Sequence, residues 1–119
     1  MFIGRSGTAM STREYGGDFR RLYPWRSVVD TPWGSAWMTI APGEASTAHS
    51  HDEEETFIII SGSGVMRVDD EQEAVGKGDV IFLPRFSEHQ LKNTSTTNPL
   101  EFLCIWWGEP SRPPGNGAD

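Results

Sequence analysis

The chain has 119 residues, a formal charge of −7 at pH 7 and a hydrophobic share of 36%. This length is typical of one compact domain, and 13 Gly, 8 Pro and 11% aromatic residues favour short strands joined by tight turns over a helical bundle. The acidic charge argues against nucleic acid as a partner because it repels phosphates, and the single cysteine excludes a disulfide within the chain.

The first 20 residues mix Gly, Ser, Thr and charged side chains without a sustained period, which predicts an irregular N-terminal arm. They lack the apolar run of a signal peptide, and no stretch of the chain approaches a membrane span of roughly 18 apolar residues. We therefore expect a cytoplasmic protein without a membrane partner. Three arginines, Arg20, Arg21 and Arg26, lie at the end of this N-terminal segment and just after it. A solvated, salt-bridged segment is the commoner interpretation of such a cluster.

Five short β-prone stretches then alternate with Gly, Pro and Asp turn signals, which is typical of an all-β sandwich or barrel. We expect one domain over residues 21–108, followed by a flexible Pro/Gly-rich tail at 109–119. The stretches are Trp37–Ile40, Phe57–Ser61, Val65–Val68, Asp79–Leu83 and Leu100–Trp107.

Two of these stretches, Phe57–Ser61 and Leu100–Trp107, carry apolar side chains on both faces, so both faces need a cover. Ile58 and Ile60 have the parity opposite to Glu55, and they face away from the barrel interior if Glu55 points into it. A homodimer through this outer face is our prediction, because a two-fold dimer is the commonest closed assembly. The N-terminal arm and a facing sheet are the other possible covers.

The three histidines of the chain are His49, His51 and His89. His49 and His51 are two residues apart, so on a strand both imidazoles point to one face. Glu55 has the same parity, although an acidic turn intervenes and parity alone does not make it converge. His89 must come from a separate strand. For any single histidine, a hydrogen-bonded core or surface role is commoner than a metal ligand.

The histidines lie within two spaced motifs that resemble those of the cupin superfamily. The first is Gly43-x5-His49-x-His51-x3-Glu55-x6-Gly62, and the second is Gly78-x5-Pro84 followed by His89-x3-Asn93. The resemblance covers about residues 36–108. It implies a single-domain, all-β jelly-roll barrel that holds one divalent metal ion through His49, His51, Glu55 and His89. These ligands leave the choice among Zn, Fe, Mn and Ni open.

One position departs from the family pattern, because Phe86 stands where cupins usually have Gly. Since Phe resists backbone angles that Gly permits, we expect the turn before His89 to be rebuilt. Arg85, beside it, is either an anchor for a substrate carboxylate or, more commonly for such a residue, part of a rim salt bridge. Glu88 is expected to point away from the site.

Further aromatic and thiol side chains are ambiguous in the sequence. Trp37, Phe57 and Trp106 either wall a substrate pocket or pack in the core, and core packing is the commoner role of strand aromatics. Cys104 lies between Leu103 and Ile105, which indicates a core residue rather than a catalytic thiol.

The resemblance favours an enzyme that acts on a small-molecule substrate by oxygenase, isomerase or rearrangement chemistry, over a non-catalytic cupin that binds a ligand or metal. The segments His51–Phe57 and Pro84–His89 are also similar to zinc-binding cupin units that form N–N bonds beside a methionyl-tRNA-synthetase-like domain. Such a synthetase-like partner would have to lie outside this sequence.

Overall fold

The computed structural model describes residues 1–5 and 11–108, and all regular structure within them is β-strand, as the sequence predicted. No helix in these residues has the length and hydropathy needed to cross a membrane. The predicted tail at 109–119 lies outside the described residues. The nine strands are β1 (Thr12–Glu14), β2 (Gly17–Tyr23), β3 (Trp33–Ile40), β4 (Glu54–Ser61), β5 (Ser63–Val68), β6 (Glu71–Gly76), β7 (Val80–Leu83), β8 (His89–Asn93) and β9 (Leu100–Trp107).

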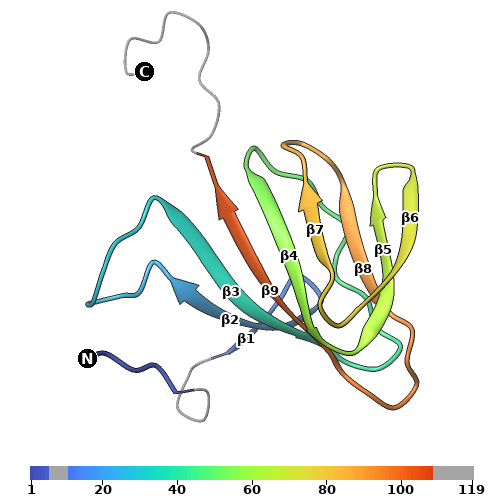
Figure 1. The fold of residues 1–119 in the computed structure, drawn as a ribbon, viewed down its shortest axis with the longest axis horizontal. Helices are drawn as coiled ribbons and strands as arrows, with labels where there is room; N and C mark the ends of the chain where they lie inside the picture. Colours follow the sequence, from blue (N-terminus) through green and yellow to red (C-terminus); the bar gives the residue numbers. More distant parts are fainter. Residues whose placement is uncertain (6–10, 109–119) are drawn as a thin grey trace, which may run out of the picture.

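The strands form two antiparallel sheets (Figure 1). One has six strands in the order β1-β2-β3-β9-β4-β7, and the other has three in the order β6-β5-β8. The many non-consecutive neighbours, such as β9 between β3 and β4, are the crossovers of a jelly roll. Each of the five predicted β-prone stretches contributes to a strand, namely β3, β4, β5, β7 and β9.

The hydrophobic core lies between the inner faces of the strands. Along a strand such as β4, buried side chains on the inner face alternate with partly exposed ones on the outer face. In β4, Glu55, Phe57 and Ile59 are buried while Ile58 and Ile60 are half-buried, so the predicted parity is confirmed. The buried apolar residues are Phe19, Ala36, Met38, Ile40, Phe57, Ile59, Met66, Leu83, Leu91, Leu100, Phe102 and Cys104.

The prediction of an irregular arm over residues 1–20 is wrong for its second half, which forms the β1–β2 hairpin. Tyr15 and Gly16 make its tight turn with φ values of 56° and 85°, the paired positive angles that suit a two-residue hairpin. β2 then pairs along β3 and buries Gly17 and Phe19. β1 has no buried residue and β2 has only two, so the hairpin sequence shows little apolar period. The predicted domain boundary at residue 21 lies inside β2.

The turn before β8 is not rebuilt around Phe86. Instead Phe86 itself takes the left-handed conformation, with a φ of 67°, that Gly adopts without strain. The turn is held by hydrogen bonds from the Phe86 N–H to the His51 carbonyl (3.0 Å) and from the Ser87 N–H to the Pro84 carbonyl (3.0 Å). It therefore ties the His51 segment to the strand that carries His89.

We expect the substitution Phe86→Gly to raise the free energy of unfolding by about 1 kcal/mol. The left-handed conformation costs a residue with a Cβ about 1–2 kcal/mol, and the greater freedom of unfolded Gly offsets only part of that gain. Few contacts are lost, because Phe86 is 62% exposed. Urea denaturation measures the change, with Phe86→Ala as the control that keeps the Cβ. If Phe86→Ala were as stable as Phe86→Gly, backbone strain would not be the cause.

Asn93, the last residue of the second motif, is fully buried at the end of β8. Its side-chain amide donates hydrogen bonds to the carbonyls of Ile40 (3.0 Å) and Asn98 (2.8 Å), and its Oδ1 accepts one from the Ser95 N–H (3.0 Å). These bonds join the β8–β9 loop to the end of β3, so the role of Asn93 is structural.

Candidate metal site

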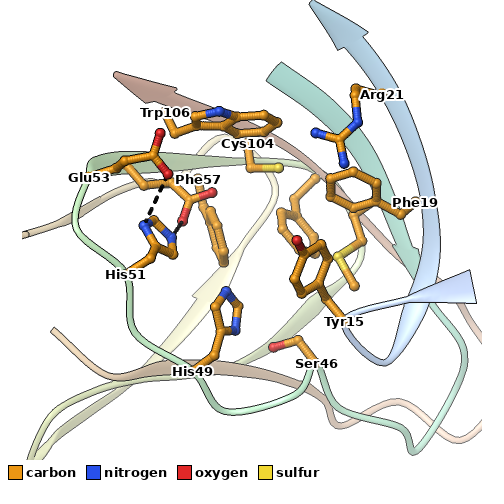
Figure 2. Close-up of a pocket in the computed structure, with 13 residues that line it drawn as sticks. Tyr15, Phe19, Arg21, Ser46, His49, His51, Glu53, Phe57, Cys104 and Trp106 are labelled. Atoms are coloured by element: carbon orange, nitrogen blue, oxygen red, sulfur yellow. Dashed lines mark hydrogen bonds and ion pairs between the residues drawn. The ribbon is translucent and has the colours of Figure 1, made fainter. Parts of the chain in front are cut away.

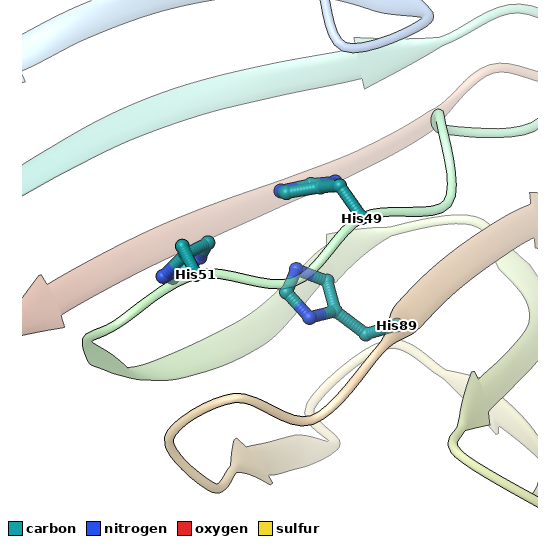
Figure 3. Close-up of side chains that lie close together, drawn as sticks. All are labelled: His49, His51 and His89. Carbon is teal, nitrogen blue, oxygen red and sulfur yellow. The ribbon is translucent and has the colours of Figure 1, made fainter.

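The side chains of the three histidines lie close together (Figure 3). One possible ligand atom from each lies within 4.8 Å of those of the other two. His89 begins β8, but His49 and His51 precede β4 rather than lying on a strand as the parity argument assumed. Their segment still runs antiparallel to β8, because His49 and His89 exchange two backbone hydrogen bonds of 3.3 and 3.0 Å. This bridge sets the spacing of the cluster.

Glu55 joins the cluster from β4, where its inward parity buries it to 6% exposure. Its Oε1 atom lies 3.0 Å from His51 Nε2 and 3.4 Å from His89 Nε2. The structure thus brings together all four residues that the resemblance implies as ligands.

Backbone carbonyls orient two of the imidazole rings. His49 Nδ1 lies 2.8 Å from the Thr47 carbonyl, and His89 Nδ1 lies 3.3 Å from the Ser87 carbonyl. Because a carbonyl only accepts hydrogen bonds, these contacts favour the neutral tautomer that carries its proton on Nδ1 and has the lone pair on Nε2. This is the outer-shell arrangement that prepares a histidine to bind a metal ion.

Glu55 and burial shift the pKa values of two of these histidines in opposite directions. The hydrogen bond to Glu55 raises the pKa of His51, whereas burial lowers the pKa of His89 and favours its neutral form. His89 Nε2 and His51 Nδ1 are buried without a hydrogen-bond partner among the described residues. Since buried polar atoms are nearly always hydrogen-bonded, the His89 Nε2 atom, which faces Glu55 Oε1 at 3.4 Å without a hydrogen bond, fits a metal ligand. Three imidazoles and one carboxylate suit a divalent transition metal.

A cavity of about 220 Å³ opens beside the cluster (Figure 2). Phe57 and Trp106 line this cavity, so they wall a pocket, which was one of the two roles expected for them. Trp37 does not line it and lies on the outer face of β3. The opposite wall is made by the hairpin residues Tyr15, Phe19 and Arg21. The sequence analysis missed Phe19 and Arg21 as cavity residues, and the odd parity that they share was the available signal. The remaining lining residues are Met38, Ser46, His49, His51, Glu53, Glu55, Phe102 and Cys104.

The hairpin is fixed to the segment that carries the histidines. The Tyr15 ring stacks on the His49 ring with a centroid distance of 5.2 Å and an interplanar angle of 25°. The Tyr15 carbonyl also accepts a hydrogen bond of 2.8 Å from the Thr47 N–H. These two contacts join the wall of the cavity directly to the His49 segment.

Arg85 and Glu88 lie outside the cavity lining. Arg85 Nη1 donates to the Asp52 carboxylate and to the Asp52 carbonyl, both at 2.7 Å, so it forms the rim salt bridge that was the commoner of its two expected roles. Glu88 pairs with Arg67 at 2.9 Å and is exposed, whereas its neighbour His89 is buried.

Cys104 is a core residue, although one side of it faces the cavity. It is 3% exposed, and its Sγ donates to the Ala36 carbonyl at 3.5 Å. Burial, together with the nearby Glu55 carboxylate, raises the pKa of the thiol to about 12. The thiolate needed for nucleophilic catalysis is therefore scarce at neutral pH.

We expect Cys104 to react with a disulfide reagent at pH 8 at least about 100-fold more slowly in the folded protein than in urea, because thiol reactivity follows the thiolate fraction and access. No other cysteine contributes to the signal. Labelling of the folded protein at the rate of the unfolded chain would contradict both the burial and the raised pKa.

Comparison with known proteins agrees with this geometry. Residues 36–106 match the family model described as "Cupin domain". A solved structure of a Photorhabdus luminescens protein superposes with a TM-score of 0.79 and 37% identity, covering 92% of this chain and 88% of that one. A tetracenomycin polyketide synthase protein of Streptomyces glaucescens is 33% identical over 76% of this chain. An oxalate-binding protein of Thermotoga maritima is 34% identical over 59% of it.

The chain spans only part of the curated relatives that it matches. The matched segments make up 61% of the Streptomyces protein and 58% of the Thermotoga protein.

Proposed function

Because the chain belongs to the cupin family, we propose that it is a metal-dependent enzyme that acts on a small molecule. In this proposal His49, His51, His89 and Glu55 hold one divalent ion, and the adjoining cavity receives the substrate. The observation that carries it is the convergence of three histidines with Glu55. Of these four residues, His49, His51 and Glu55 line the cavity, and the buried His89 Nε2 lies behind them without a hydrogen bond to a described residue.

The ion would supply either Lewis-acid polarisation of a substrate oxygen or a position for activating water or oxygen. Four protein ligands leave such positions open only where the ion takes five or six ligands in total. The protein's own residues contribute the rest. Thr47 and Ser87 orient imidazole rings, and Phe57 and Trp106 exclude water from one side of the cavity.

A second candidate is a binding protein without catalysis, which the name of the Thermotoga relative supports. The name of the Streptomyces relative supports a role in biosynthesis instead. We favour the enzyme, because convergent metal ligands beside a cavity commonly mark active sites. The resemblance to zinc-binding cupin units that form N–N bonds stays a prediction, and it rests on the two segments His51–Phe57 and Pro84–His89.

Elemental analysis of the purified protein tests the metal centre directly. We expect close to one equivalent of a divalent transition metal per chain. Iron would direct the search toward oxygen-dependent reactions, and zinc toward Lewis-acid or rearrangement reactions. A protein that binds no divalent transition metal, either as purified or after loading, would overturn the proposed enzyme.

Metal affinity should fall in acid, because protons compete with the ion for the imidazole lone pairs. The pKa of His51 is raised above the ordinary value of 6.5, so competition at His51 should persist above that pH. The pKa of His89 is lowered, so His89 competes only in more acidic solution. Titrations with zinc between pH 5 and pH 8 should show affinity rising with pH throughout. A flat profile would count against histidine ligation.

We also propose that the chain forms a homodimer through the outer face of the six-stranded sheet. On that face Ile58 lies in register with Leu103 and Val80, and Phe82 stacks on Trp107 at 6.3 Å. Val80 and Phe82 are 67% and 52% exposed. Exposed apolar patches of this kind commonly mark interfaces. Sedimentation at micromolar concentration should give twice the chain mass, and a monomeric mass would contradict the dimer.

A further inference from the structure

The wall of the cavity that faces the histidines carries a positive charge, supplied by Arg21 of β2. Among the described residues that line the cavity, Arg21 is the only Arg or Lys. Figure 2 shows its guanidinium group pointing into the cavity from the side opposite to His49 and His51. The cavity therefore has two polar ends, a candidate metal centre and a guanidinium group.

The Arg21 guanidinium group is held in place by aromatic rings. Its central carbon lies 5.0 Å from the centroid of the Phe19 ring and 5.8 Å from that of the Trp106 ring, which are cation–π distances. The two rings are themselves stacked, with centroids 6.5 Å apart. Aromatic contacts of this kind orient a guanidinium group without using its N–H donors, which stay available for an anion.

One carboxylate competes for these donors, that of Glu14 on β1. Its Oε1 atom lies 3.8 Å from Arg21 Nη2, which is too long for a hydrogen bond. The other oxygen of Glu14 accepts a hydrogen bond from the Thr12 hydroxyl. No Arg21 donor is hydrogen-bonded to another described residue, so a ligand carboxylate can take two of them at once.

The space between the two polar ends is mostly aromatic. Phe57 and Phe102 line it with a ring-centroid distance of 4.6 Å, and Tyr15 and Trp106 lie on other sides. A cavity of about 220 Å³ is smaller than the roughly 300–1,000 Å³ of sites for drug-sized ligands. Flat walls and small volume together favour a ligand with a single ring.

We infer that Arg21 is the anion-binding residue of this cavity, and that the substrate is a small aromatic carboxylic acid whose carboxylate meets Arg21 while an oxygen at its other end meets the metal. This inference rests on the proposed function for the metal-facing end only. The carboxylate-binding role of Arg21 is inferred from the cavity wall alone. Ligand binding to Arg21 can therefore be measured both with and without metal.

The test compares two probes of the same shape, 4-hydroxybenzoate and its neutral amide 4-hydroxybenzamide. Their dissociation constants are measured by isothermal titration calorimetry on the wild-type protein and on Arg21→Gln, Arg21→Lys and Arg20→Gln, each metal-free and zinc-loaded. Arg20 is the matched control, because it is adjacent on β2, points to the outer face and lines a different hollow. The net charge of −7 disfavours an anion, so a preference for the acid requires a local cation.

We expect the wild-type protein to bind the acid about tenfold more tightly than the amide, the effect of one charge-assisted interaction. Arg21→Gln should lose this preference without weakening amide binding, Arg21→Lys should keep part of it, and Arg20→Gln should behave as wild type. Unchanged amide affinity in Arg21→Gln shows that the cavity is intact.

Three results would overturn the inference: an undiminished preference for the acid in Arg21→Gln, an equal loss in Arg20→Gln, or no binding of either probe to the wild type at millimolar concentration. The proposed function fails separately, when no divalent metal binds. In that case the metal-free titrations still decide the role of Arg21.

Discussion

Replacing His89 by Ala should weaken metal binding by at least about 100-fold, and His49→Ala and His51→Ala should do the same. Loss of an outer-shell partner alone costs 10–100-fold in metal affinity, and a lost ligand costs more. Metal content after dialysis gives a direct measurement. Thermal unfolding gives a second one, since zinc at 100 times the wild-type dissociation constant should stabilise the wild-type protein by about 2.7 kcal/mol and a variant weakened 100-fold or more by at most about 0.4 kcal/mol.

Glu88→Gln is the matched control for these ligand variants. Glu88 adjoins His89 but is exposed and pairs with Arg67, so the change removes a nearby negative charge without removing a ligand. Its metal content and zinc stabilisation should equal those of the wild type. Stoichiometric metal retained in all three histidine variants would remove the basis of the proposed centre.

Asn93→Ala should lower the free energy of unfolding by about 3 kcal/mol. The substitution leaves two backbone carbonyls, those of Ile40 and Asn98, and one N–H, that of Ser95, without the partner they have now. Each buried polar group left unpaired costs about 1–3 kcal/mol, although water that enters the space recovers part of this. Guanidinium denaturation measures the loss.

Asn98→Ala provides the comparison for this prediction. Asn98 is exposed and uses its backbone, not its side chain, in the bonds described above. Its replacement should change stability by less than about 0.5 kcal/mol, as is usual for surface positions. Similar losses in both variants would show that the loop tolerates disruption generally, and that the buried amide of Asn93 is not special.

Much of the fold and of the candidate ligand set could be predicted from the sequence, because both follow from local patterns. The alternation of side chains along a strand placed Glu55 and Phe57 on the inner face and Ile58 on the outer face. The two motifs predicted that His49 and His89 bind the same metal ion. These features depend on spacing along the chain, which a sequence shows directly.

The opposite wall of the cavity could not be predicted in the same way. Arg21 looked like part of a solvated basic cluster, and its position in the cavity depends on the pairing of β2 with β3, a contact between different parts of the chain. Tyr15 contacts His49 only because a two-residue turn folds β1 back onto β2. Phe86 is a case in which the fold overrides local preference. The turn imposes its positive φ of 67°, which a residue with a Cβ disfavours.

The family match begins at residue 36, whereas the hairpin that closes the cavity lies entirely before it. Selection can therefore act on the two parts separately. Under the proposed function, changes at the cavity-facing positions of β2 would alter which substrate binds, while the backbone bridge between His49 and His89 stays in place. We expect descendants of such a protein to diverge in substrate through this hairpin while they inherit one reaction centre.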